Sequence, residues 1–357
     1  MTVYIVVYLL IIIFAFVIYN FKTTEKIQNR LFLIFSSILL ILISGFRGYY
    51  VGSDTKNYAE WFSYLSGFSF KDLIFDKSRD IEIGYKLFSY ILSKISNNPR
   101  IVIFVSSVFI VISIMFFLYK YSDNLFISVI LFLGLNHFFT AINTYRMYLG
   151  LAIIVWAFDA LHNKRILKAL LLCALGFLFH RMSIVFSAIM LVSYLLRNKR
   201  RYVLIAFAAE VLILPFIQLI ITTIVNIFPK YKVYIEEDNA SNSIGTLNLL
   251  LFILEVLIIV LWLLRGEDDK PYINMLVIML SFSSFFRVVG NTIPRGFRVV
   301  QLLNFVTLLI IPYMFLRDKN NRKIYIPVIS LFSFSLFIYY MIINAAEVVP
   351  YTIQWSY

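Results

Sequence analysis

Apolar runs separated by short polar segments extend along almost the whole chain. Most of these runs are long enough to cross the ~30 Å hydrocarbon core of a bilayer as helices. The pattern therefore predicts an all-α fold, a polytopic transmembrane helix bundle of about 12 membrane segments. The segments lie at roughly 3–21, 31–46, 100–119, 124–140, 143–161, 166–179, 181–196, 202–228, 247–265, 271–289, 298–316 and 323–344.

The two runs on either side of His180 are the shortest of the set, at 166–179 and 181–196. Either they are two full crossings, or the chain forms a membrane-buried bend or re-entrant pair at His180 and Arg181.

The composition supports a membrane protein. Hydrophobic residues make up 61% of the 357 residues, charged residues only 14%, and the mean hydropathy is +0.87. Soluble domains do not reach these values. The single cysteine, Cys173, excludes a disulfide within the chain, and three widely separated histidines give little support to a transition-metal site.

A net charge of +13 could indicate a nucleic-acid partner, but the basic residues follow the membrane segments instead. Six basic segments alternate with less basic ones, so the positive-inside rule places the six in the cytoplasm and 47–99 outside. We therefore expect no nucleic-acid partner, and one integral membrane domain over 1–357 with an extracytoplasmic insertion at 47–99. The basic segments contain Lys22, Lys26, Arg30, Lys120, Lys164, Arg165, Lys168, Arg197, Lys199, Arg200, Arg201, Arg265, Lys270, Arg317, Lys319, Arg322 and Lys323.

Residues 82–96 of the insertion have apolar side chains at helical spacing. This pattern predicts an amphipathic helix on the outer membrane surface. It could be a lid that seals the bundle or an element that grips substrate. The apolar positions are Leu87, Phe88, Ile91, Leu92 and Ile95.

Ionisable side chains collect at the outward ends of the predicted spans. An arginine inside a membrane helix costs roughly 2.5–3.5 kcal/mol on insertion scales, although snorkelling to the interface is an alternative for each. Several arginines with few acids to neutralise them indicate an anionic ligand, such as a lipid-linked diphosphate or the substrate of an anion transporter. The cluster consists of Arg47, Asp54, Glu82, Arg146, His180, Arg181, Arg287, Arg295 and Arg298.

Several of these residues also have structural interpretations. Asp54 could cap a helix that begins near Thr55, and Glu82 could pair with Arg47 or Arg79. Tyr58 and Tyr85 could stack on sugar rings or belong to the aromatic belt of the interface.

A set of motifs in the first hundred residues consists of Gly45-Phe46-Arg47, Val51-Gly52-Ser53-Asp54-Thr55 with Tyr58, and Glu82-Ile83-Gly84-Tyr85. Later motifs are Tyr145-Arg146-Met147, Phe179-His180-Arg181-Met182-Ser183, Arg298 with Pro312, and Pro350-Tyr351. The first set resembles the opening of the EpsG family of polysaccharide polymerases, relatives of the Wzy-type O-antigen polymerases, and the later motifs follow in the family's order.

The chain departs from the family pattern at two places. Gln301-Leu302 stands where an aromatic pair is expected, and Arg181 stands where lysine is more usual. These departures put the roles of Arg298 and Arg181 in question.

The resemblance implies a glycosyltransferase that transfers a growing glycan from undecaprenyl diphosphate onto a lipid-linked repeat unit. The reaction would take place at the outer face of the bacterial cytoplasmic (inner) membrane and would build O-antigen, capsule or exopolysaccharide. Arginines would hold the diphosphate and a single acid or histidine would act as the base, without a metal or other cofactor. The diphosphate ligands would be Arg47, Arg146, Arg181 and Arg298, with Arg287 and Arg295 behind them; the candidate bases are Asp54, Glu82 and His180.

The resemblance also implies partners: an undecaprenyl-diphosphate-linked oligosaccharide, membrane lipid, and a chain-length regulator and flippase of the same pathway. The alternatives are a flippase or transporter of lipid-linked oligosaccharide, and a related membrane glycosyltransferase or glycan ligase. The outward collection of charges and the lack of an internal repeat disfavour a transporter, whose site usually lies at the midplane between repeated halves.

Overall fold

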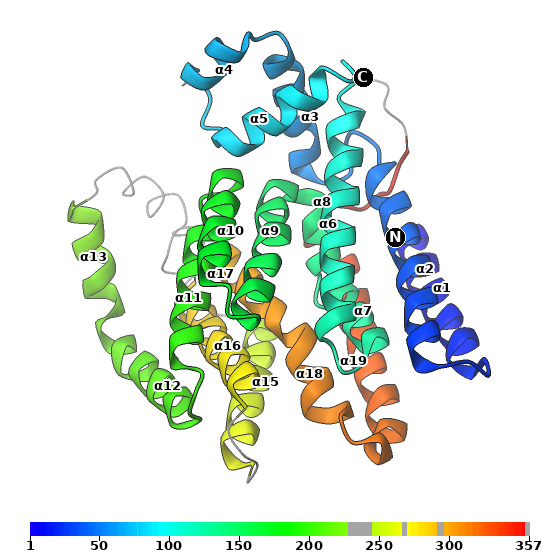
Figure 1. The fold of residues 1–357 in the computed structure, drawn as a ribbon, viewed down its shortest axis with the longest axis vertical. Helices are drawn as coiled ribbons and strands as arrows, with labels where there is room; N and C mark the ends of the chain where they lie inside the picture. Colours follow the sequence, from blue (N-terminus) through cyan, green and yellow to red (C-terminus); the bar gives the residue numbers. More distant parts are fainter. Residues whose placement is uncertain (77, 228–244, 266–269, 291–295, 354–357) are drawn as a thin grey trace. The chain divides into compact units, whose positions relative to one another are not determined.

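The computed structural model describes residues 1–76, 78–227, 245–265, 270–290 and 296–353 (Figure 1). Regular structure within these ranges is helical throughout, so the predicted all-α class is confirmed. The chain divides into two compact units, Met1–Ser183 with Ile311–Tyr357, and Ile184–Ile310.

The first unit contains the N-terminal helices, the insertion and the C-terminal helix. Its helices are α1 (Thr2–Asn20), α2 (Glu25–Gly45), α3 (Ser53–Ser66), α4 (Phe70–Phe75), α5 (Ile83–Ser93), α6 (Arg100–Tyr121), α7 (Leu125–Gly134), α8 (His137–Asn143), α9 (Tyr145–His162), α10 (Ile166–Phe179) and α19 (Arg322–Ile342).

The second unit is formed by α11 (Ser183–Leu196), α12 (Arg201–Ile213), α13 (Ile217–Ile227), α15 (Thr246–Leu264), α16 (Pro271–Val289) and α17 (Gly296–Leu303). The helix α18 (Thr307–Leu316) runs across the boundary between the two units.

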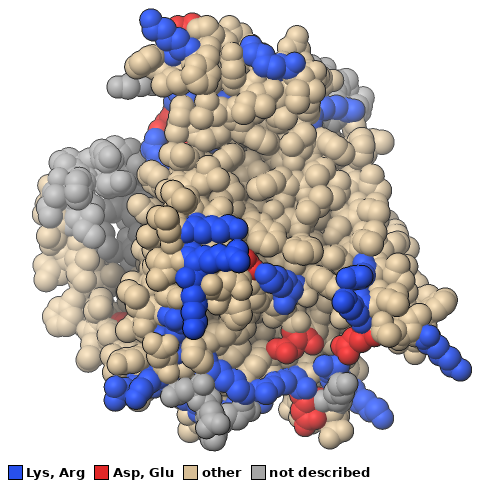
Figure 2. Space-filling model, viewed as in Figure 1, with Lys and Arg blue, Asp and Glu red and all other residues tan. Residues whose placement is uncertain are grey.

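By length and composition, eight of the described helical segments could cross a membrane, or nine if the bent pair α7 and α8 is one span. The predicted twelve is therefore not confirmed; α10 and α11 in particular are shorter than a full span. The middle parts of α2 and α6 contain no charged residue, and Figure 2 shows a broad uncharged surface over them with Lys and Arg near the helix ends.

The bend between α7 and α8 follows from one residue. Asn136 takes a left-handed backbone conformation (φ 66°), which ends α7, and the two helices meet at 53°. Asparagine is one of the few residues that visit this region at low cost.

The insertion forms a small layer of its own at the top of the view in Figure 1, where α3, α4 and α5 gather beside the upper end of α6. Its core is aromatic and aliphatic, from Tyr58, Phe62, Leu65, Leu73 and Tyr85. Helix α5 turns a partly polar face inward and leaves Ile91 exposed, as is Ile95 beyond its end. Contact of this apolar side with a lipid surface stays a prediction.

Glycines allow α10 to approach its neighbours closely. A side chain at Gly150 of α9 would come within 3.2 Å of the backbone oxygen of Gly176 in α10, and one at Gly176 would come within 2.8 Å of Ile154 in α9. Gly84 of α5 lies equally close to α10, since a Cβ there would stand 2.6 Å from the backbone oxygen of Leu178. Gly84 therefore fixes how near the insertion lies to the end of α10.

We expect Gly84→Ala to destabilise the protein by about 1–3 kcal/mol, because the added methyl meets a carbonyl of rigid helical backbone. Thermal unfolding in detergent measures the effect. Gly67→Ala is the matched control, since a Cβ at Gly67 meets only an ordinary contact at 3.8 Å. Equal melting temperatures for the two variants would contradict this close approach.

Candidate functional site

Arg47 lies inside the first unit, directly after α2. Its side chain is 1% exposed, and Nε donates to Thr55 Oγ1 at 3.3 Å. Nη1 donates to the backbone oxygen of Ser44 and to Ser107 Oγ, the latter at 3.2 Å. These bonds connect α2, α3 and α6, so in this structure Arg47 acts as a buried structural link between three helices.

Arg146 and Glu82 form an ion pair near the base of the insertion. Nη1 of Arg146 lies 2.5 Å from Glu82 Oε2, and the two side chains are 14% and 11% exposed. The guanidinium carbon lies over the rings of Tyr58, Trp61 and Tyr85, at 5.5, 4.5 and 5.7 Å from the ring centres. Cation–π contacts of this kind strengthen as water is excluded.

Local folding explains how these side chains meet. Glu82 is the N-cap of α5, but its carboxylate makes no cap bond and instead receives Arg146, at the start of α9. The hydroxyl of Tyr85 shares a hydrogen bond of 2.5 Å with that of Tyr145. Burial raises the pKa of Tyr85 to about 12, so its hydroxyl stays protonated at neutral pH. Tyr58 and Tyr85 are both buried, with their rings around Arg146.

Asp54 lies in α3, one turn before Tyr58. Its Oδ2 accepts a hydrogen bond from Tyr58 at 3.2 Å, and its backbone N–H donates to Asn143 Oδ1 at 2.9 Å. Helix α3 begins at Ser53 with Gly52 as its N-cap, so Asp54 lies in the first turn and does not cap the helix. Gly52 has φ +83°, and a Cβ there would approach the Cα of Asn143 at 3.0 Å.

His180 and Arg181 occupy the break between α10 and α11. His180 is buried and ends α10, its N–H bonding the backbone oxygen of Gly176 at 3.1 Å. Arg181 is 60% exposed and forms a two-pronged pair with Asp80, itself 74% exposed. The backbone N–H of Arg181 also lies 3.4 Å from Glu82 Oε1, so Glu82 links both arginines.

In the second unit, Arg287 is buried against Glu255. Nη2 and Nε lie 2.6 and 3.3 Å from the two carboxylate oxygens, and Asn248 and Ser283 complete the cluster. Breaking a buried pair by removing one partner is strongly destabilising, so this pair holds α15 against α16.

The two remaining predicted residues are Arg295 and Arg298. Arg298 lies half-buried in α17 of the second unit, and Arg295 lies outside the described residues. The first unit thus brings together seven of the eleven predicted site residues near one end. They are Asp54, Tyr58, Glu82, Tyr85, Arg146, His180 and Arg181.

Two acids that pair with arginines, Asp80 and Glu255, were not among the predicted site residues. Asp80 lies two residues before Glu82, and Glu255 is a carboxylate inside the apolar run 247–265. An intramembrane acid is a functional signal by itself and could have identified Glu255. Trp61, which covers Arg146, had no distinguishing signal beyond its place in α3.

Within the ranges that the structure describes, no group of three His, Cys, Asp or Glu side chains is arranged to hold a metal ion. A shallow groove of about 270 Å³ lies near Arg47, lined by Gly45, Phe46, Arg100, Ile101 and Phe104. It offers an apolar surface at the same end of the unit.

A buried ion pair fastens α4 to α5. Lys86 Nζ lies 3.3 Å from Asp76 Oδ2 and also donates to the backbone oxygen of Asp76. Ser78 and Tyr64 donate to the other carboxylate oxygen, at 2.5 and 3.3 Å. The hydrogen bond from Ser78 is the largest cause that lowers the pKa of Asp76, from 3.8 to about 2, and Lys86 adds to it.

Because the pKa of Asp76 is lower in the folded chain, its stabilisation is present above about pH 4 and is lost as pH falls toward 2. We expect amides of α4 and α5 to lose hydrogen-exchange protection over that range, after correction for intrinsic rates. Asp76→Asn should remove this pH dependence, and Asp72→Asn, inside α4 and one turn before Asp76, should keep it. An unchanged profile in Asp76→Asn would show that another group controls the insertion.

These observations define the class: a multi-pass helical membrane protein with paired arginines and aromatic rings beside a polar insertion. The sequence model of the EpsG family matches residues 30–353, and the chain belongs to that family, which is of the polysaccharide-polymerase type. No curated protein and no solved structure matches the chain significantly. Membership of the EpsG family is thus confirmed, whereas kinship to Wzy-type O-antigen polymerases stays a prediction.

Proposed function

We propose that this protein polymerises lipid-linked glycan repeat units on the outer face of the bacterial cytoplasmic membrane. The supporting observation is that Glu82 pairs with the guanidinium of Arg146 and accepts the backbone N–H of Arg181, inside the motifs that resemble the EpsG family. The guanidinium of Arg181 pairs with Asp80 instead. Guanidinium groups are suited to a diphosphate, since each can donate two parallel hydrogen bonds to phosphate oxygens.

In the proposed reaction, a hydroxyl of the incoming lipid-linked unit attacks the anomeric carbon of the growing chain. The bond from that carbon to the diphosphate oxygen breaks, and undecaprenyl diphosphate leaves with the electron pair. The hydroxyl proton passes to a protein base. Negative charge grows on the leaving oxygen, where preorganised guanidinium donors stabilise the transition state most.

Arg181 is the residue that we propose first meets the diphosphate. Its partner Asp80 and its own side chain are largely exposed, and such pairs are worth only about 0–1 kcal/mol. A diphosphate can therefore replace Asp80 at little cost. The apolar groove that contains Phe46 and Phe104 could receive part of the polyprenyl chain.

Arg146 is the second donor. It keeps Glu82 as its partner, and among the described residues its buried Nε makes no hydrogen bond. A buried donor of this kind needs an acceptor, and an oxygen of a bound diphosphate would supply one. The half-exposed ring of Trp61 is a surface on which a sugar could stack.

For the base we favour Asp54. Glu82 is engaged by Arg146 and by the backbone of Arg181, and His180 is buried at the end of α10. Asp54 is half-buried, and the described residues give its carboxylate one hydrogen-bond donor, Tyr58. Glu82 then serves as a positioning residue for the arginines.

Arg181→Ala should lower the polymerisation rate at least about a hundredfold, the usual loss for one transition-state donor. The measurement is chain growth by purified protein in liposomes supplied with lipid-linked repeat units. Lys168→Ala, an exposed cation near the other end of α10, is the matched control and should polymerise normally. If both variants lost equal activity, the assignment of Arg181 would be wrong.

The base assignment is tested by pH–rate profiles of Asp54→Asn, Glu82→Gln and His180→Gln in the same assay. We expect Asp54→Asn to lose the acidic limb of the profile, because the ionised base is absent at every pH. Glu82→Gln should lower the rate and keep the limb. Loss of the limb in His180→Gln alone would transfer the role to His180.

A further inference from the structure

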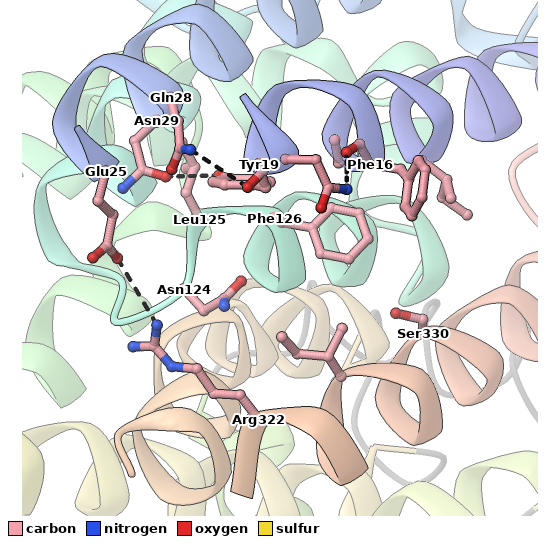
Figure 3. Close-up of a pocket in the computed structure, with 14 residues that line it drawn as sticks. Phe16, Tyr19, Glu25, Gln28, Asn29, Asn124, Leu125, Phe126, Arg322 and Ser330 are labelled. Atoms are coloured by element: carbon pink, nitrogen blue, oxygen red, sulfur yellow. Dashed lines mark hydrogen bonds and ion pairs between the residues drawn. The ribbon is translucent and has the colours of Figure 1, made fainter. Parts of the chain in front are cut away.

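A cavity of about 550 Å³ opens in the first unit (Figure 3). Helices α1, α2 and α19 and the start of α7 line it. Glu25 at its mouth and Gly45 near Arg47 are the two ends of α2, which corresponds to ~30 Å at 1.5 Å per residue. The cavity is therefore remote from the paired arginines, and its volume suits a small-molecule ligand.

The lining changes from polar to apolar along the helices. Asn20 and Arg322 lie at the ends of α1 and α19. Ile12, Phe16 and Ile326 lie one to two turns further in, where Ser330 adds one hydroxyl to a mainly apolar lining. This order matches a molecule with a polar head near the helix ends and an apolar chain that follows the helices inward.

The polar end offers hydrogen-bond donors. Asn29 Oδ1 accepts from Tyr19 at 2.6 Å, and Asn124 Oδ1 accepts the backbone N–H of Ile127 at 3.0 Å. Both amide oxygens are thus occupied, while among the described residues neither Nδ2 group donates a hydrogen bond. Two amide donors beside a guanidinium favour a phosphate group.

Arg322 is held in place and remains available. Its Nε donates to the backbone oxygen of Leu316 at 2.8 Å, which fixes the side chain. Its Nη1 lies 3.9 Å from Glu25 Oε1, beyond hydrogen-bond distance, and the Glu25 side chain is 60% exposed (Figure 3). Such a loose, exposed pair is weak, so a phosphate could displace the carboxylate.

We propose that this cavity binds one anionic glycerophospholipid. Its phosphate would contact Arg322, Asn29 and Asn124, and one acyl chain would lie between α1 and α19. The apolar depth favours a lipid over free phosphate, and the surrounding cations favour an anionic headgroup. The nearby exposed cations are Lys22, Lys26, Arg30 and Lys323.

The test is native mass spectrometry of the purified full chain in detergent, titrated with phosphatidylglycerol or phosphatidylethanolamine. We expect wild type to bind phosphatidylglycerol about tenfold more tightly than phosphatidylethanolamine. The affinity of Arg322→Gln for phosphatidylglycerol should be about tenfold weaker than that of wild type. Glu25→Gln should bind it several-fold more tightly, a gain that misfolding cannot produce. Lys323→Gln, an exposed cation next to Arg322 that does not line the cavity, should change affinity less than twofold.

Equal losses in Arg322→Gln and Lys323→Gln would overturn the proposal, since a general attraction to basic helix ends would then account for binding. Equal affinity for the two lipids would overturn the anionic headgroup. Displacement of the lipid by glycerol 3-phosphate at similar concentration would show that the chain contributes nothing and would overturn the lipid assignment.

Discussion

The constraint that shapes this protein is the cost of burying guanidinium groups in an apolar helical fold. An unpaired charge in a low-dielectric interior costs several kcal/mol, so each buried arginine requires its own partner. Arg47 is stabilised by hydroxyl and carbonyl dipoles, Arg146 by the carboxylate of Glu82 and by aromatic rings, and Arg287 by the carboxylate of Glu255. These solutions also fasten helices together, so the same charges supply architecture and candidate chemistry.

The exposure of each arginine side chain indicates whether its role is structural or in binding. Arg47 and Arg287 are almost fully buried and bonded to neighbouring helices, which favours structural roles. Arg181 is exposed, as is its partner Asp80, and the Nε of Arg146 is a buried donor without a hydrogen bond among the described residues. In our proposal, the diphosphate replaces Asp80 as the partner of Arg181 and binds beside the Arg146–Glu82 pair, which stays intact. The anion therefore meets a site in which Arg146 is already oriented.

The sequence predicted the helical class because long apolar runs have few folds open to them in lipid. The opening motifs also indicated one site, and Asp54, Glu82, Arg146 and Arg181 do lie near one another. The pairing could not be predicted: Glu82 and Arg146 are 64 residues apart, and their contact depends on how α5 packs beside α9 and α10. Likewise, nothing local distinguishes Arg47, which is buried, from Arg181, which is exposed.

In our proposal, the chain joins repeat units after they reach the outer face of the membrane. We would test this first in cells that lack the protein and carry wild type or Arg181→Ala, with lipid-linked single units assayed on each face together with the glycan ladder. We expect single units to accumulate on the outer face without long chains when activity is lost. Accumulation on the cytoplasmic face would overturn the proposal and would make the arginines part of a transport path.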